Sequence, residues 1–309
     1  MALAPFPIDP ALTAIAIAYK NPDYIADMVM PRVAVDKQKF TFLQYAVDTF
    51  FNVPDTRVGR RSQPNEVTLD AVEVADFCED YGLRGGVPNA DIDNSDSRHD
   101  PLGVETMFLQ EQIALDRERR VAAIIHAQAS YDAGLRVALA GNDKFTDYVN
   151  SDPIGVINSA LEAPLARPNQ MVFNSYGWSK FRAHPKIVEA VKGTGAKAGN
   201  ASREAVAELF EIDEVIVGKA RANSNKRGQA AAIVPLFGKH IALIHKAPVP
   251  EAKGAVTFGA SFQFGDRIAG QWEDKNMGLR GGIAVQTGES LRERIVANQA
   301  GYLIENAFA

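Results

Sequence analysis

Histidine and cysteine are the residue types that most often bind metals or act in acid–base and nucleophilic catalysis, and the chain holds five histidines and one cysteine. Neither an H-E-x-x-H nor a C-x-x-C spacing occurs, so the main zinc-binding patterns are absent from the sequence. His240 and His245 fall on one predicted strand, but their odd spacing places them on opposite faces. His184 precedes Pro185 and is expected to cap a helix or pack. We therefore predict structural or surface histidines and no metal site.

Phosphate binding and acyl transfer leave other signatures, and the sequence lacks both. Gly193, Gly195 and Gly199 suggest a phosphate loop, but no G-x-x-x-x-G-K-[ST] motif is present. No G-x-S-x-G nucleophile elbow occurs either. The sequence thus predicts a protein that is not an enzyme and uses no cofactor. A triad assembled in space leaves no such motif, so a soluble hydrolase with a lid insertion stays the alternative of another class.

Composition sets further bounds. The 309 residues are enough for about two domains, and 33 basic residues against 38 acidic ones give a net charge of −5. This balance argues against a dedicated nucleic-acid binder, whose affinity comes mostly from Lys and Arg on phosphates. The lone Cys78 excludes an internal disulfide and is expected to be a small buried hydrophobic residue. Residues 11–19 are apolar but too few to cross a bilayer, so we expect no membrane contact.

The elements that position these residues are organised around one long stretch, 100–131. Asp100 is a plausible N-cap with Pro101 at the first helical position, so we predict one helix about 45 Å long. The predicted face comprises Val104, Phe108, Glu111, Leu115, Ala122 and Ile125. Five consecutive charges occupy residues 116–120, and they indicate a spine lying across a surface. A solvated helix with i,i+4 ion pairs is the alternative.

The segments before this helix bury little on their own. Residues 1–30 predict an extended arm with one short helix near 22–28. Residues 32–84 predict two long strands joined by a polar, arginine-bearing tip at 50–67. Because an isolated two-stranded hairpin is marginal in water, we expect it to lie on a neighbouring molecule.

The segments after the helix alternate between helix and strand patterns, which predicts a compact α/β domain. Helices are expected from Pro153, over 175–193 with a break at Pro185, and after an N-cap at Ser202. Strands are expected at 168–175 and 214–218. The runs AAIVPLF and HIALIHK are predicted to pair with each other across Gly238–Lys239. Residues 247–309 return to strand patterns.

The order of these elements resembles the major capsid proteins of tailed bacteriophages, which have the Hong Kong 97-type fold. Four strings carry the resemblance: DMVMPRVAVDKQKF (27–40), DPIGVINSALEAPLARPNQMVFNSYGWSKFRAHPKIVEAV (152–191), AELFEIDEVIVGKA (207–220) and SLRERIVANQAGYLIENAF (290–308). The likeness covers most of the chain in one order, which is more specific than any single string.

The resemblance implies an α+β fold with an N-arm, an extended β-hairpin loop, a long spine helix, peripheral β-strands and an α/β axial domain. The expected parts are the N-terminal arm 1–31, the extended loop 32–84, the peripheral domain with the spine helix 85–144, the axial domain 145–246, and the peripheral strands with a C-terminal segment returning to the axial domain 247–309.

The implied function is a structural head protein that self-assembles into hexamers and pentamers of an icosahedral shell around double-stranded DNA. The implied location is the virion, with assembly in the host cytoplasm. Expected partners are further copies of the chain, scaffolding, portal and decoration proteins, and packaged DNA through non-specific contacts. An encapsulin-type nanocompartment shell, which packages an enzyme, is the alternative within the same fold.

The charged tip of the loop suits such an assembly. Its arginines are expected to face acidic residues on the spine helix of an adjacent subunit. The predicted interface residues are Arg57, Arg60, Arg61, Glu105, Glu111 and Glu118. Exposed ion pairs contribute roughly 0–1 kcal/mol each, so their expected role is register and specificity, while buried apolar area supplies most of the affinity.

Overall fold

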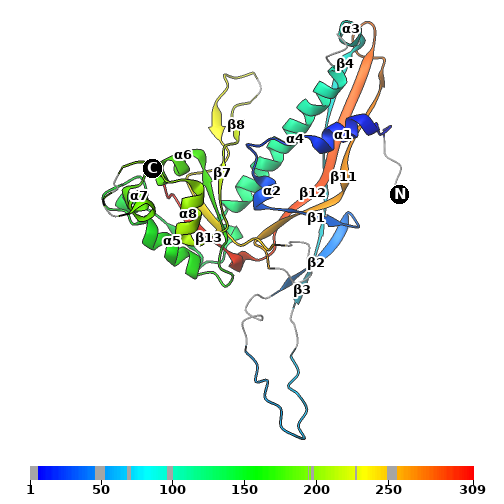
Figure 1. Ribbon diagram of the computed structural model, residues 1–309. Coiled ribbons are helices and arrows are strands. Elements are labelled where there is room, and N and C mark those ends of the chain that lie inside the picture. Colours follow the sequence, from blue (N-terminus) through cyan, green and yellow to red (C-terminus); the bar gives the residue numbers. More distant parts are fainter. Residues whose placement is uncertain are drawn as a thin grey trace.

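The structure is a computed structural model that describes residues 6–45, 53–67, 71–95, 100–193, 195, 198–226, 228–248 and 256–309. Two sheets dominate it, an elongated one beside a long helix and a smaller one covered by several short helices (Figure 1). Because strands and helices are largely segregated, the architecture is α+β, as expected from the sequence.

The elongated sheet has four strands in the order β1-β11-β12-β4. Its strands are β1 (Arg32–Val35), β4 (Glu79–Pro88), β11 (Gly259–Asp274) and β12 (Gly282–Ile295). The long helix α4 (Pro101–Ile125) packs on β12 and β4, and α1 (Pro10–Ala18) packs on β11 and α4. Leu12, Leu109 and Val285 form a small apolar core between α1, α4 and β12.

The smaller sheet has five strands in the order β5-β13-β10-β6-β7. Its strands are β5 (Arg136–Ala138), β6 (Gln170–Asn174), β7 (Glu214–Gly218), β10 (Ile241–Ile244) and β13 (Gly301–Glu305). The associated helices are α5 (Pro153–Glu162), α6 (Ser175–Phe181), α7 (Pro185–Lys192) and α8 (Arg203–Phe210). Every residue of β6 and β10 is buried, because both faces of the sheet are covered.

Alternating residues of the smaller sheet enter two different cores. Met171 and Phe173 pack with the helices α5 to α8. Val172, between them, packs with Val121 and Ile125 at the end of α4 on the other face. The second core also includes Ile25 and Met30 beside α2 (Ala26–Val29), so the arm, the long helix and the smaller sheet meet in one place.

Two hairpins project from this body (Figure 1). The larger pairs β2 (Lys39–Tyr45) with β3 (Ala71–Phe77) in a two-stranded sheet of their own. Its described tip, residues 53–67, is exposed throughout. The smaller pairs β8 (Arg221–Asn223) with β9 (Ile233–Pro235). Each hairpin has hydrogen-bonded neighbours only within itself among the described strands.

The long helix differs from its prediction at its end and in its buried face. It ends at Ile125, short of residue 131, because the Tyr131 hydroxyl donates to the Ile125 carbonyl (2.7 Å) as the chain turns away. Val104 and Phe108, two of the residues on the predicted face, are each 55% exposed. The face that packs on the sheet instead includes polar residues, among them Gln110 and Arg117. These residues interrupt the apolar spacing from which a buried helix face is predicted.

The arm contains more regular structure than predicted. Besides α2, it forms the helix α1, whose N-cap Asp9 accepts from the backbone N–H groups of Ala11 and Leu12. Pro10 occupies the first helical position, so the arm carries the same start signal as the long helix. A further short helix, α3 (Asn89–Asp93), follows β4 outside the arm.

Two strand pairings also differ from prediction. The hairpin is shorter than the predicted block, because β1 pairs in parallel with β11 and β4 pairs with β12. The run containing β9 does not pair with β10, since β9 turns back onto β8 and β10 is inserted between β13 and β6. The predicted elements at 168–175, 214–218 and on both sides of Pro185 are confirmed.

The described residues hold no helix that is long and apolar enough to cross a bilayer. Within the same ranges, no group of three or more His, Cys, Asp or Glu side chains is placed to hold a metal ion. Cys78 is fully buried beside Phe40 and Phe262, which confirms it as a small hydrophobic residue of the core.

Candidate functional site

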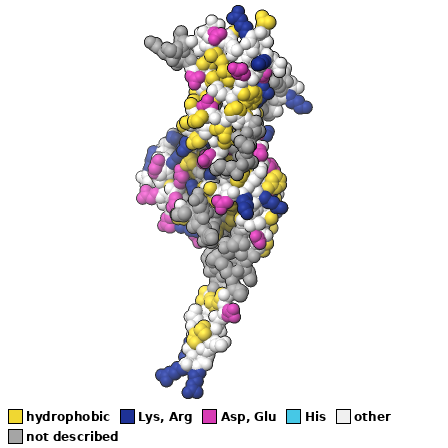
Figure 2. All heavy atoms as spheres, turned by 90° about the vertical axis from the view of Figure 1, so that its right-hand side faces the viewer, with side chains coloured by type: hydrophobic (Ala, Val, Ile, Leu, Met, Phe, Trp, Pro, Cys, Tyr) yellow, Lys and Arg dark blue, Asp and Glu magenta, His cyan; other side chains and the backbone are white. Residues whose placement is uncertain are grey.

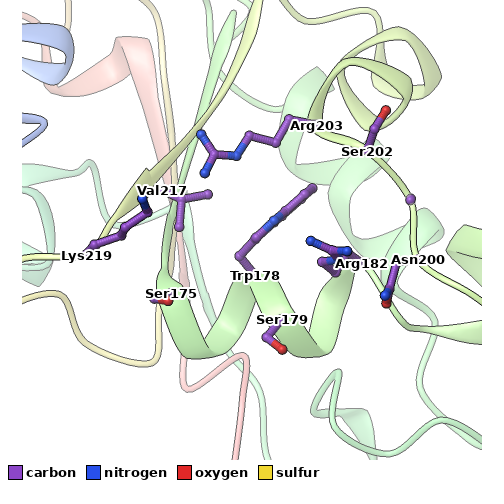
Figure 3. A pocket seen from close by; sticks show the side chains of 10 residues that line it. Ser175, Trp178, Ser179, Arg182, Asn200, Ser202, Arg203, Val217 and Lys219 are labelled. Atoms are coloured by element: carbon purple, nitrogen blue, oxygen red, sulfur yellow. The ribbon is translucent and has the colours of Figure 1, made fainter. Parts of the chain in front are cut away.

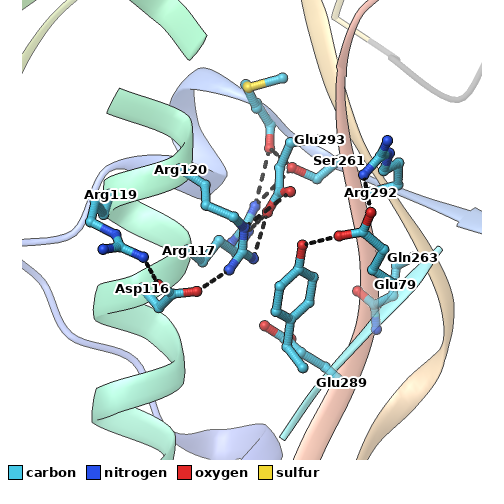
Figure 4. A network of polar contacts seen from close by, with 12 residues as sticks. Glu79, Asp116, Arg117, Arg119, Arg120, Ser261, Gln263, Glu289, Arg292 and Glu293 are labelled. Atoms are coloured by element: carbon cyan, nitrogen blue, oxygen red, sulfur yellow. Dashed lines mark hydrogen bonds and ion pairs between the residues drawn. The ribbon is translucent and has the colours of Figure 1, made fainter. Parts of the chain in front are cut away.

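A largely buried charge network lies where the arm, the long helix and the elongated sheet meet, and Figure 4 shows its members Arg117, Arg120, Glu289 and Glu293. Its members are Asp27, Arg32, Arg117, Glu118, Arg120, Arg267, Glu289 and Glu293. Four are basic and four acidic, so the network is electrically balanced. Charged side chains this deep in a protein need partners, because transfer out of water is costly.

Glu118 and Arg117 connect the long helix to the arm. Glu118 is fully buried, and its carboxylate accepts from the backbone N–H groups of Ile25 and Ala26, each at 2.8 Å. These two N–H groups lie at the start of α2, where they have no partner within that short helix. Arg117 donates to the Asp27 carboxylate at 2.6 Å and to Ser261 Oγ at 3.1 Å. The two residues therefore fix the arm on one side of the helix.

Glu289 and Glu293 connect the same helix and arm to β12. Arg32 and Arg267 donate to Glu289 at 2.8 and 3.0 Å, and Arg120 donates to Glu293 at 2.9 Å. Figure 4 shows Arg117 and Arg120 reaching from the helix toward Glu293 on the strand. The network thus holds three segments that are remote in sequence in one arrangement.

The pKa directions agree with this geometry. Burial alone would raise the pKa of Asp27, but Arg117 and Arg32 lower it below its ordinary value. Burial would likewise raise the pKa of Glu289, and Arg32 with Arg267 lowers it. For Glu118, burial prevails and raises the pKa, although the N–H groups of Ile25 and Ala26 oppose it. Arg32 also borders a surface pocket beside Gln263 and Gly265, but its guanidinium group is paired with Asp27 and Glu289, so the arrangement is structural.

The predicted interface acids occupy different positions. Glu118 lies inside the network, and Glu111 accepts from Tyr19, Asn21 and Tyr24 of the same chain. Burial and Glu111 raise the pKa of Tyr19 to about 12. Glu105, in contrast, is half-buried over Gly85 and has no hydrogen-bond or ion-pair partner among the described residues.

The predicted interface arginines lie at the far end of the molecule from these acids. Arg57, Arg60 and Arg61 are exposed in the tip, and they form the dark-blue group at the end of the projecting hairpin (Figure 2). One chain therefore does not bring the arginines and the acids together. Contact between the two sets requires a second copy, and it stays a prediction.

A histidine pair lies at the joint between the long helix and the smaller sheet. His126 follows α4, and its Nδ1 accepts from the Gly238 N–H at 3.3 Å. The His240 ring lies 5.1 Å from it, centroid to centroid, and accepts from the Asn306 N–H. Burial and His240 lower the pKa of His126 to about 3. His184 caps α7 by accepting from the Lys186 N–H, as predicted.

The lowered pKa of His126 predicts that the protein loses stability in acid. Since the folded pKa of about 3 lies below the ordinary 6.5, the unfolded chain takes up the proton first as the pH falls. The free energy of unfolding should decrease between pH 6.5 and 3, by up to about 4 kcal/mol from this residue. Urea unfolding of wild type and His126→Asn across this range measures it. An equally steep decrease in the variant would contradict the assignment.

Comparison with known proteins decides what kind of protein carries this geometry. No family model matches the chain. The major capsid protein of Pseudomonas phage JBD67 is 42% identical over 309 residues, which is 100% of both chains. The chain belongs to the family of phage major capsid proteins. A second relative, the major capsid protein of Burkholderia phage BcepMu, is 28% identical over 219 residues, covering 69% of each chain.

Solved structures agree on the fold of this capsid protein. A phage-related protein from Bordetella bronchiseptica RB50 has a TM-score of 0.78 at 24% identity, covering 98% of this chain and 99% of its own. The capsid of cyanophage P-SCSP1u has a TM-score of 0.58 at 11% identity, covering 93% and 89%. The predicted family and the Hong Kong 97-type fold are confirmed.

The fold alone does not separate capsids from encapsulins. The SrpI encapsulin complex of Synechococcus elongatus PCC 7942 has a TM-score of 0.54 at 11% identity, covering 99% and 96%. The sequence relatives separate them, since both are phage capsid proteins. The chain is therefore a structural protein of a phage capsid, located in the virion, and the hydrolase interpretation has no support.

Proposed function

We propose that this capsid protein forms hexamers and pentamers that close into an icosahedral shell around double-stranded DNA. One observation carries the proposal: the hairpin tip, residues 53–67, is exposed along its whole length and includes Val53, which is 94% exposed, and Val58 and Val67. A two-stranded hairpin with apolar residues in water is marginal by itself. Identical neighbours in a shell supply the missing cover.

The outer face of α4 is the complementary surface for this tip. Val104, Met107 and Phe108 are 55%, 40% and 55% exposed on the helix, and Glu105, half-buried over Gly85, borders them. This strip offers apolar contact and a negative charge, while the tip offers valines and the arginines 57, 60 and 61. We therefore place the tip of one copy on the first half of α4 of the next. Glu111 and Glu118 then serve within their own chain.

Further parts of the function follow from the shell. The protein acts without enzymatic activity and assembles in the host cytoplasm, with scaffolding, portal and decoration proteins as partners. Its net charge of −5 has the sign of DNA and argues against a dedicated nucleic-acid binder, and we propose only non-specific contact with the packaged genome. The proposed functional parts follow the expected divisions at residues 31, 84, 144 and 246.

Imaging of the purified full-length protein by negative-stain electron microscopy tests this function. We expect closed shells, together with free five- and six-membered rings in samples where shell closure is incomplete. Particles recovered from infected cells should contain nuclease-protected DNA. A chain that stays a monomer or small oligomer at all concentrations would refute the shell. Closed shells filled with an enzyme in place of DNA would favour the encapsulin alternative.

A further inference from the structure

A basic pocket lies at the carboxyl ends of the parallel strands β6 and β7. It has a volume of about 510 Å³, and its floor is Trp178, which is 6% exposed. Around this floor stand Arg182 at the end of α6, Arg203 at the start of α8 and Lys219 just after β7. Figure 3 shows these three side chains on different sides of Trp178. We call this site the basic pocket.

The basic pocket has too few acidic neighbours in its own chain. Lys219 pairs with Asp23 at 3.1 Å, and both side chains are 53% exposed. Glu204 is directed to the start of α8, where its own backbone N–H and the Ser202 hydroxyl lower its pKa. Neither Arg182 nor Arg203 has an ion-pair partner among the described residues. Apart from a hydrogen bond from Arg182 to the neutral side chain of Asn200 at 3.2 Å, the site therefore presents open guanidinium groups, which prefer carboxylates or phosphates.

An acidic turn lies at the opposite end of the same strand. It consists of Glu208, Glu211 and Asp213, which precede β7 and are exposed. Glu211 also lies within 3.5 Å of Arg167, but its side chain remains 81% exposed. Since β7 has five residues, the acidic turn and the basic pocket are about 16 Å apart along the strand. One copy cannot place its own acidic turn in its own pocket.

Ring assembly brings such opposite ends together. Every contact in a cyclic ring is heterologous, so one patch of each copy meets a different patch of the next. A basic patch and an acidic patch at opposite ends of one small domain satisfy this requirement, whereas like charges facing each other would repel. The ring itself rests on the proposed function above.

We propose that the basic pocket of one copy binds the acidic turn of the next copy in the ring. The carboxylates of Glu211 and Asp213 pair there with Arg182 and Arg203. Trp178 supplies an apolar floor beneath the ion pairs and limits their access to water. This contact sets the order of subunits around the ring, separately from the projecting hairpin.

Charge reversal with compensation tests the contact. One variant carries Arg182→Glu with Arg203→Glu, and another carries Glu211→Lys with Asp213→Lys. Each should weaken the contact between two copies at least about tenfold, which corresponds to about 1.4 kcal/mol, and should therefore reduce the yield of rings and shells. The variant with all four substitutions should restore assembly. Arg182→Lys with Arg203→Lys keeps the charge and should assemble as wild type does, and circular dichroism confirms that each variant is folded.

A mixture of the two reversed variants provides a second readout. Alternation of the two types around a ring pairs every pocket with an opposite charge, so six-membered rings should form. Five-membered rings cannot alternate and should be absent by negative-stain imaging.

Three results would overturn the contact: normal assembly of either reversed variant, no assembly of the folded variant with all four substitutions, or five-membered rings from the mixture. If the pocket instead binds DNA phosphates, the Arg182 and Arg203 variant will form normal shells that lack DNA. A wild-type protein that forms no rings would refute the proposed function, which is a different result from failure of the compensated variant alone.

Discussion

Replacing Glu118 with alanine is expected to lower the free energy of unfolding by about 3–5 kcal/mol. The substitution leaves the N–H groups of Ile25 and Ala26 buried without an acceptor, because both donate to this carboxylate at 2.8 Å. It also leaves Arg117 with one less neutralising charge. Urea unfolding of the unassembled protein measures the effect. Hydrogen exchange over residues 19–32 should increase, since the arm loses its attachment to α4.

Two further substitutions, one at the same position and one two residues away, bracket this result. Glu118→Gln keeps one acceptor oxygen for the two N–H groups and should fall between wild type and Glu118→Ala. Asp116→Ala removes a carboxylate that is 38% exposed and pairs only with Arg119 and Arg120 among the described residues, so it should cost less than about 1 kcal/mol. A Glu118→Ala protein as stable as Asp116→Ala would show that the charge network does not hold the arm.

Reversing the hairpin tip with Arg60→Glu and Arg61→Glu is expected to abolish shells while the α/β domain stays folded. The two residues are exposed and remote from every core, so the change should not alter the stability of a single chain. Between copies, however, two charges change sign at each contact with the strip around Glu105, so the local charge changes by four units. The small penalty per contact then repeats over the whole shell.

The measurement for the tip is the shell yield by sedimentation, with near-UV circular dichroism as the test of folding. Arg60→Lys with Arg61→Lys keeps the charge and serves as the matched control, which should form shells. Shells from the reversed variant at wild-type yield would refute a role of the tip in assembly. A compensating Glu105→Lys substitution should recover part of the yield if the strip on α4 is the partner.

The α/β domain could be predicted from sequence because its signals are local. The strand around Val172 is a short apolar run after a turn, Pro185 interrupts a helix pattern, and Ser202 is an N-cap that accepts from the Ala205 N–H. Each signal depends on residues only a few positions apart. Local propensity and tertiary packing agree there, so the elements form where the pattern places them.

The charge network could not be predicted, because its partners are distant in sequence. Arg120 and Glu293 are 173 residues apart, and the charged run 116–120 looks solvated when the strand partners are unknown. The same reason explains the wrong helix face: Arg117 can be buried because Asp27 and Ser261 accept hydrogen bonds from its guanidinium group. Burial of charge is a tertiary property, and periodicity does not report it.

The predictions of strand pairing were wrong for a related reason. The run AAIVPLF, which contains β9, predicts a strand but does not specify its partner. The short turn at Gly238–Lys239 before β10 suggested that these two strands form a hairpin. In the structure Leu236 donates back to the Ala220 carbonyl, which continues the pairing of β9 with β8.

The sequence does hold a signal for the basic pocket. Polar residues that follow parallel strands meet at one edge of a sheet, as Ser175 and Lys219 do.

A high-resolution cryo-electron microscopy map of the assembled particle tests the central claim most directly, namely that copies of this chain cover one another's projecting hairpins. The map should show residues 53–67 of each copy lying on the outer face of α4 of a neighbour, with the arginines 60 and 61 near Glu105. A particle in which this hairpin contacts only its own chain, or stands free in solvent, would contradict the account.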